Sequence, residues 1–193
     1  RMIDALPELP ESERRGMTTF RALVRSRVSP ERFAHIERVV DLALRVGEAN
    51  RFTSEDLARV ELAALLHDAA RDLDDAELLR LAPPENTVES DHPLSVHGRA
   101  GRRLAEQWGV TDETVLEAIE GHVFGVPLTN KVGAAVYVAD VCEPGRGVNQ
   151  DLRELALTDL AAAYRRAVAV KVDYLRRSGK DVHPATLAAY ESL

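Results

Sequence analysis

Cysteine is nearly absent from this chain of 193 residues, and Cys142 is the single example. An internal disulfide bond is therefore impossible, and so is a zinc site built from several thiolates. Any metal ion that the chain binds must be held by nitrogen and oxygen atoms, which histidine and carboxylate side chains supply. We interpret Cys142 itself as a small apolar residue of the core with no catalytic partner.

Long apolar runs are also missing from the sequence. None approaches the roughly 18 residues that a membrane-spanning helix requires. The first ten residues carry acids and two prolines, and they lack an apolar stretch of signal-peptide length. We therefore expect a loose leader, a cytoplasmic location and no membrane partner.

Basic residues are in the minority, because 25 lysines and arginines face 32 aspartates and glutamates and leave a net charge of -7. This balance argues against a protein whose whole surface binds nucleic acid. Basic residues do cluster over residues 14–32 and 164–180. Charge runs on helices usually keep them soluble, so we interpret both clusters as solvated helix faces.

The strand-type alternation of apolar and polar residues does not occur, and the apolar residues recur instead at helical spacing. The length is that of one domain. The predicted fold is therefore an all-α bundle in a single domain. Capping signals at Ser29, Thr53, Asp74, Thr111-Asp112 and Thr158 predict helix starts. The expected helices cover about residues 11–27, 30–47, 54–66, 74–82, 94–108, 112–122, 129–141, 159–177 and 184–193.

The predicted helices group into three parts of the chain. Residues 1–28 form a leader and a first helix, residues 29–147 form the core, and residues 148–193 form C-terminal helices that pack on it. Residues 83–93 have no periodicity, and we expect a polar loop of the kind that often covers a site.

The sequence also predicts the burial of single residues. His92 and His183 each precede a proline and are interpreted as surface residues. Phe20 and Trp108 are expected in the core, and Tyr164 and Tyr174 are expected to be half-buried.

Histidine and aspartate stand side by side at His67-Asp68, on an apolar part of a predicted helix. Burying an imidazole and a carboxylate together costs several kcal/mol unless something compensates them, and a metal cation suits both. Further residues of the ligand type lie in other segments, and they are His35, His97, His122 and Asp140. The sequence therefore predicts a metal centre assembled from separate helices.

The sequence motifs around these residues resemble those of a known family. They are Arg32-Phe33-Ala34-His35, Leu65-Leu66-His67-Asp68-Ala69-Ala70-Arg71, His97-Gly98, His122-Val123-Phe124-Gly125 and Tyr137-Val138-Ala139-Asp140-Val141-Cys142-Glu143-Pro144-Gly145-Arg146. The order of these motifs along the chain resembles that in the HD-domain metal phosphohydrolases. The residues within the motifs resemble those of the YqeK family of symmetrical diadenosine tetraphosphate hydrolases. The resemblance covers about residues 30–146.

The resemblance implies an HD-domain fold and a two-metal centre. His35, His67, Asp68 and Asp140 would hold one ion, and Asp68 would bridge to a second ion held by His97 and His122. Nitrogen and oxygen ligands suit iron, and manganese or cobalt remain possible. The implied reaction is hydrolysis of diadenosine tetraphosphate (Ap4A) to two ADP by an activated water. Asp68 and Arg71 are the candidate catalytic residues, and Arg71, Arg99 and Arg146 are the candidate phosphate-binding residues.

Three positions depart from the family pattern: Arg71 replaces a common lysine, Val123 a threonine and Phe33 a tyrosine. They leave two alternatives open. The substrate could be another nucleotide, such as a mono-, di- or triphosphate or a cyclic nucleotide. The chain could also be a non-catalytic nucleotide sensor or an RNA-associated module. Glu143 either orients a ligand or caps a helix end, and a homodimer is compatible with a helical architecture.

Overall fold

The computed structural model describes residues 11–193, and it describes the side chains from Gly16 onward. The predicted leader therefore lies outside the described residues. Within residues 11–193 the structure has helices and turns but no β-strand, which confirms the all-α prediction. In the same part of the chain, every helix is too short or too polar to cross a lipid bilayer.

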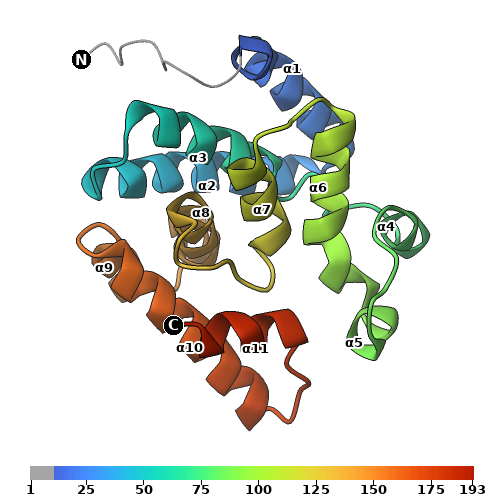
Figure 1. Cartoon of the computed structure of the whole chain (residues 1–193), viewed down its shortest axis with the longest axis vertical. Helices are drawn as coiled ribbons and strands as arrows, with labels where there is room; N and C mark the ends of the chain where they lie inside the picture. The colour runs from blue at the N-terminus through green and yellow to red at the C-terminus, as the bar shows by residue number, and fades with distance from the viewer. Residues whose placement is uncertain (1–10) are drawn as a thin grey trace.

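The helices follow one another along the chain with short connections (Figure 1). The α-helices are α1 (Glu11–Arg27), α2 (Pro30–Ala49), α3 (Ser54–Leu66), α4 (Asp75–Leu81), α5 (Thr87–Asp91), α6 (His97–Gln107), α7 (Glu113–Gly121), α8 (Lys131–Cys142), α9 (Gln150–Ala156), α10 (Leu160–Arg177) and α11 (Pro184–Glu191). Two 3-10 helices, η1 (Pro93–Val96) and η2 (Pro144–Arg146), precede α6 and follow α8.

Side-chain caps begin these helices where the sequence predicts them. Ser29 accepts a hydrogen bond from the Arg32 amide at the start of α2, and Thr53 accepts one from the Asp56 amide at the start of α3. The cap of α10 is an exception, because Asp159 rather than Thr158 accepts the amide of Ala162. A carboxylate one residue later therefore starts this helix.

Helix α8 lies at the centre of the molecule. Nearly all of its residues are buried, and it packs against α2, α3 and α7 on one side and against α9 and α10 on the other (Figure 1). Its valines favour strands, but neighbours on every side bury a helix there and decide its conformation. The carboxyl end of α8, which carries Asp140, is thereby held inside the bundle.

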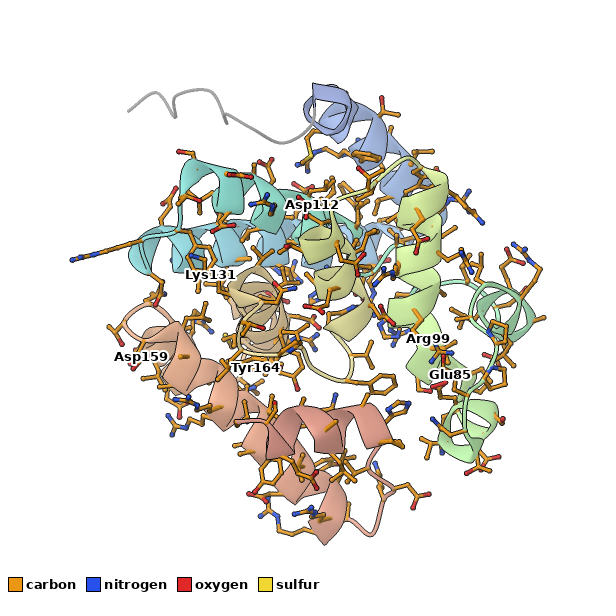
Figure 2. The ribbon with its side chains drawn as sticks, viewed as in Figure 1. Glu85, Arg99, Asp112, Lys131, Asp159 and Tyr164 are labelled. Atoms are coloured by element: carbon orange, nitrogen blue, oxygen red, sulfur yellow. The ribbon has the colours of Figure 1, made fainter. Side chains whose placement is uncertain are left out.

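Tyr164 fastens α10 to the loop that follows α7. Its hydroxyl accepts a hydrogen bond from the Val126 amide at 2.7 Å and donates one to the Val126 carbonyl at 2.5 Å. The side chain is fully buried, not half-buried as predicted, and it points from α10 into the bundle (Figure 2). Gly125 allows this loop to turn with a backbone φ of 116°, which residues other than glycine rarely adopt.

The segment between residues 83 and 93 differs from the prediction, because it contains the short helix α5 rather than a continuous polar loop. Glu89 of α5 is fully buried, and its carboxylate accepts hydrogen bonds from Arg99 at 2.6 Å and from His183 at 3.0 Å. His183 is only 9% exposed, so its prediction as a surface residue is wrong. Hydrogen bonds from α6 and from the residue before α11 order this region, and no local pattern reports such contacts.

The burial of several other side chains agrees with the sequence for some and differs for others. Phe20 and Cys142 are buried as predicted, and His92 is exposed as predicted. Trp108 is only partly buried, with the Arg27 guanidinium 5.4 Å from its ring centre. Tyr174 is 54% exposed, which contradicts its half-buried prediction.

Candidate metal centre

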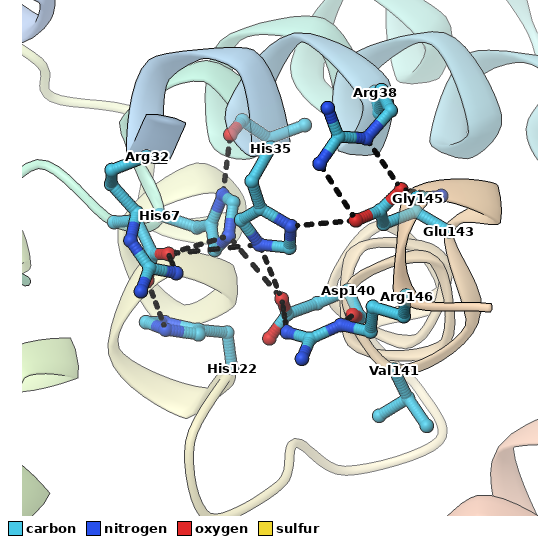
Figure 3. Close-up of polar contacts among 12 residues, drawn as sticks. Arg32, His35, Arg38, His67, His122, Asp140, Val141, Glu143, Gly145 and Arg146 are labelled. Atoms are coloured by element: carbon cyan, nitrogen blue, oxygen red, sulfur yellow. Dashed lines mark hydrogen bonds and ion pairs between the residues drawn. The ribbon is translucent and has the colours of Figure 1, made fainter. Parts of the chain in front are cut away.

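Ends of helices bring the six predicted metal ligands together. His35 lies in the second turn of α2, His67 is the C-cap of α3, and Asp68 follows it. His97 begins α6, His122 is the C-cap of α7, and Asp140 lies in the last turn of α8. Figure 3 shows most of these side chains pointing toward one another.

Asp68 stands between two groups of histidines. Its Oδ1 lies 3.2 Å from His122 Nε2 and 3.3 Å from His97 Nε2. Its Oδ2 lies 3.6 Å from His67 Nε2 and 3.8 Å from His35 Nε2. The two oxygens of one carboxylate therefore face two separate groups of nitrogen atoms.

Asp140 completes the group around His35. Its Oδ1 lies 2.9 Å from His35 Nε2 and 3.7 Å from His67 Nε2. Two sets of ligand atoms, each mutually within 4.8 Å, could hold a metal ion. One is His35, His67 and Asp140, and the other is His67, Asp68 and His122.

Backbone and carboxylate acceptors hold each histidine in one orientation. Three of them donate Nδ1–H to the carbonyl three residues earlier: His67 to Ala64 at 2.6 Å, His97 to Leu94 at 2.7 Å and His122 to Ile119 at 2.7 Å. His35 Nδ1 lies 3.0 Å from Glu143 Oε1. When a ring is neutral, the proton on Nδ1 leaves Nε2 with a lone pair that points into the centre.

These inward lone pairs fit a cation. His97 Nε2 and His122 Nε2 are 3.0 Å apart, and two acceptors cannot hydrogen-bond to each other. His67 Nε2 is buried and has no hydrogen-bond partner among the described residues. Buried polar atoms are rarely left unsatisfied, and the donor set of imidazoles and carboxylates is one that divalent metal ions accept. The residues present therefore fit a metal centre.

The charges in the centre are strongly coupled. Burial alone would raise the pKa of Asp68 and Asp140, but the neighbouring histidines outweigh it and hold both pKa values well below the ordinary range. Burial lowers the pKa of His67, but the two carboxylates outweigh it and raise the pKa to about 9. Burial also lowers the pKa of His122, and there it prevails. A metal ion must displace the proton of His67, so its affinity depends on pH.

Two arginines that support the centre were not predicted. Arg32 donates to Asp68 Oδ2 at 3.0 Å, and Arg38 donates to Glu143 Oε2 at 2.8 Å. Each lies three residues from His35 on α2, so helical spacing could have found them. Arg38, His35 and the Gly145 amide all bond to Glu143 and, against burial, lower its pKa to about 2. Glu143 thus both orients His35 and caps η2.

A cleft of about 830 Å³ opens over the centre and extends to α10. Arg71 and Arg146 line it, and Arg146 lies 3.0 Å from Asp140 Oδ1. Arg99 does not line it, because its guanidinium is bound to Glu89 and to the Pro83 carbonyl, and it points toward Glu85 near α5 (Figure 2).

Lys171 of α10 also lines the cleft and was not predicted. Its ammonium donates to the carbonyl of Val123, the residue after His122, and burial lowers its pKa. The sequence motifs end before α10, and only the tertiary fold brings Lys171 to the site. Arg166 and Arg177 of the same helix line the cleft as well, so its far wall is cationic.

The helical fold and the histidine–aspartate centre are those of an HD domain, and the HD domain family model matches residues 32–163. The chain therefore belongs to the HD-domain family of hydrolases. Within it, the chain belongs to the YqeK-type branch, whose members are named symmetrical bis(5'-nucleosyl)-tetraphosphatase.

Known proteins of that branch match most of the chain. The protein of this name from Bacillus subtilis (strain 168) is 31% identical over 179 residues, which cover 89% of this chain and 94% of that protein. The protein of the same name from Staphylococcus aureus (strain NCTC 8325 / PS 47) is 30% identical over 141 residues. The match covers 69% of this chain and 71% of that protein. The fold is also similar to a crystal structure from Clostridium acetobutylicum, which is described as a predicted HD superfamily hydrolase involved in NAD metabolism. The TM-score is 0.81 at 26% identity, and the match covers 91% of this chain and 95% of that chain.

Proposed function

We propose that the protein is a metal-dependent hydrolase that cleaves Ap4A symmetrically to two ADP. The observation that carries the proposal is the pair of histidine groups that share the Asp68 carboxylate at the floor of a cationic cleft. The names of its relatives in Bacillus subtilis and Staphylococcus aureus support the same substrate.

Two ions would be held by the six clustered residues. His35, His67, Asp68 and Asp140 would hold one, and Asp68 with His97 and His122 would hold the other. We propose iron, and manganese and cobalt suit the same donor atoms. When bound, such ions polarise phosphoryl oxygens and lower the pKa of a water ligand.

In the proposed reaction, one water molecule is consumed for each Ap4A. The water oxygen bonds to one of the two central phosphorus atoms, and the bond from that phosphorus to the central bridging oxygen breaks. The bridging oxygen leaves with the other half of the molecule. Both halves are then ADP, and the proton of the water that is not retained passes to solvent.

The residues of this chain would bind and orient the substrate. Arg146 and Arg71 present guanidinium groups to the cleft, which suit phosphoryl oxygens in pairs. Lys171 presents a compact charge on the opposite wall, beside Val123. Arg32 also lines the cleft and donates to Asp68 Oδ2, which helps to fix the direction of that carboxylate.

The test is product analysis. Protein loaded with iron, manganese or cobalt is incubated with Ap4A, and the products are separated by ion-exchange chromatography. We expect ADP alone, at twice the amount of Ap4A consumed. Formation of AMP plus ATP, or no turnover with any of the three metals, would overturn the proposal.

A second candidate substrate class has a structural basis of its own. Arg71 and Val123, which stand where the family pattern has lysine and threonine, both line the cleft. Because they alter the groups that meet the phosphates, the enzyme could hydrolyse another nucleotide instead. The same chromatography with nucleoside mono-, di- and triphosphates and cyclic nucleotides distinguishes the two, since only one class should reach a high kcat/KM.

A further inference from the structure

Exposed apolar side chains gather along the cleft. Among the described residues, the large hydrophobic side chains that are exposed are Leu94 (39%), Val148 (56%), Val170 (57%) and Tyr174 (54%). The last three all line the cleft over the metal centre, whereas Leu94 does not. Apolar groups are costly to expose, and a concentration of them at a cavity marks a ligand-binding surface.

The cleft residues of α10 form one face of that helix. Residues three or four positions apart lie on the same side of a helix. The cleft residues of α10 follow this spacing, and they are Arg166, Ala167, Val170, Lys171, Tyr174 and Arg177. This face extends over about 16 Å at 1.5 Å per residue. Lys171 lies near its middle, beside the residue that follows His122, and the cleft continues past Lys171 in both directions.

The arrangement around Tyr174 suits a nucleoside attached to phosphates. Lys171 and Arg177 lie three residues from Tyr174 on either side and line the same cleft, and the Lys180 ammonium lies 5.6 Å from the centre of the exposed Tyr174 ring. Cationic groups bind phosphate, and an aromatic ring stacks on a nucleobase. A cleft of about 830 Å³ is near the upper end for small-molecule sites, which leaves room for a nucleoside beyond the phosphates at the centre.

We propose that Tyr174, supported by Val170, is the surface on which one nucleobase of the substrate stacks. This inference rests on the proposed function for the identity of the substrate, and it adds the specificity residue for the nucleoside. The base lies on α10 while the phosphate chain extends past Lys171 to the metal centre. Tyr174 acts on substrate affinity and not on the chemical step.

The test is equilibrium binding to the metal-loaded full chain by titration calorimetry. The probes are ADP, which has a base, and inorganic pyrophosphate, which has none. The variants are Tyr174→Ala, Tyr174→Phe and, as a control, Arg165→Ala, an exposed residue of α10 that does not line the cleft. Base stacking is worth about 1–3 kcal/mol, so Tyr174→Ala should weaken ADP binding by about 5- to 150-fold.

The expected pattern is specific. Pyrophosphate binding stays unchanged in Tyr174→Ala, ADP binding is retained in Tyr174→Phe, and Arg165→Ala binds both probes as the parent does. Equal ADP affinity in the parent and Tyr174→Ala, or an equal loss for both probes, would overturn the inference. If Tyr174 supports ADP binding but Ap4A is not hydrolysed, the proposed function fails and the base-stacking surface stands.

Discussion

At the residue scale, the direction of each imidazole matters more than its position. His67, His97 and His122 use one ring nitrogen to donate to a carbonyl of their own helical turn, which leaves the other free to face the centre. A local hydrogen bond thus selects the tautomer that a metal needs. Because the acceptor is a backbone carbonyl, any sequence that keeps the turn keeps this orientation.

Asp68 is the residue whose change should have the largest effect. Asp68→Asn keeps the shape but removes the charge that faces both histidine groups. We expect it to lose most bound metal and to lower kcat/KM for Ap4A by at least about 100-fold, since ligand charge is central to metal binding. Elemental analysis and steady-state kinetics measure both effects. Asp75→Asn, in the first turn of α4, is the exposed control, and a fully active, metal-free Asp68→Asn would contradict the assignment.

Glu143 should act on the metal through His35. Its carboxylate carries charge at every working pH because its pKa is lowered to about 2 by Arg38, His35 and the Gly145 amide, against burial. Glu143→Gln keeps the shape but weakens the acceptor for His35, so metal affinity should fall about 10- to 100-fold. Competition with a chelator measures this change. Glu154→Gln, on the exposed side of α9, should leave metal affinity as it is. Unchanged metal affinity in Glu143→Gln would show that the carboxylate only caps η2.

At the element scale, α10 offers two adjacent arginines, of which Arg166 pairs with Asp151 at 3.2 Å. Arg165 and Arg166 are both exposed, but only Arg166 lines the cleft. If the substrate lies along this face, Arg166→Ala should raise the KM for Ap4A about 3- to 10-fold, as the loss of one exposed phosphate contact does. Arg165→Ala should not change it. Initial rates over a range of Ap4A concentrations give both values, and equal KM values would move the substrate away from α10.

Helix α5 should depend on the charge of Glu89. Burial would raise its pKa, but hydrogen bonds from Arg99 and His183 outweigh it and lower the pKa. A carboxylate with a lowered pKa stabilises the fold when the pH is above the ordinary pKa of glutamate. This stability is lost as the pH falls through the lowered pKa. Glu89→Gln should therefore reduce the free energy of unfolding by about 2–3 kcal/mol at pH 7.

The difference between the parent and Glu89→Gln should shrink as the pH falls below the ordinary pKa of glutamate toward the lowered pKa of Glu89, where the parent carboxylate becomes neutral as well. Urea unfolding at several pH values measures it. Glu85→Gln, which changes an exposed carboxylate 3.8 Å from Arg99, is the matched control and should cost little at any pH. A pH-independent difference would mean that shape and not charge orders α5.

At the scale of the whole molecule, the proposed metal centre draws its residues from helices that are distant in sequence. Its residues come from α2, α6, α7 and α8 and from the end of α3, so a bound ion links most of the core. An ion at a hundred times its dissociation constant stabilises the folded state by about 2.7 kcal/mol. Chelation should lower Tm by several degrees, and metal should restore it. Scanning calorimetry checks this, and Asp68→Asn should not respond to either treatment.

The sequence by itself determined the longer helices, most of their caps and the types of residue that could hold a metal, but it did not predict the short helices α5 and α9. Those features depend on spacing and hydrogen bonding within one or two turns, as at Ser29, Thr53 and Asp112. Only the tertiary structure decided which charges meet: Arg99 is bound to Glu89, His183 is buried beside it, and Lys171 reaches the cleft. These pairings join residues far apart in the chain, and their energy depends on burial and packing that no local pattern records.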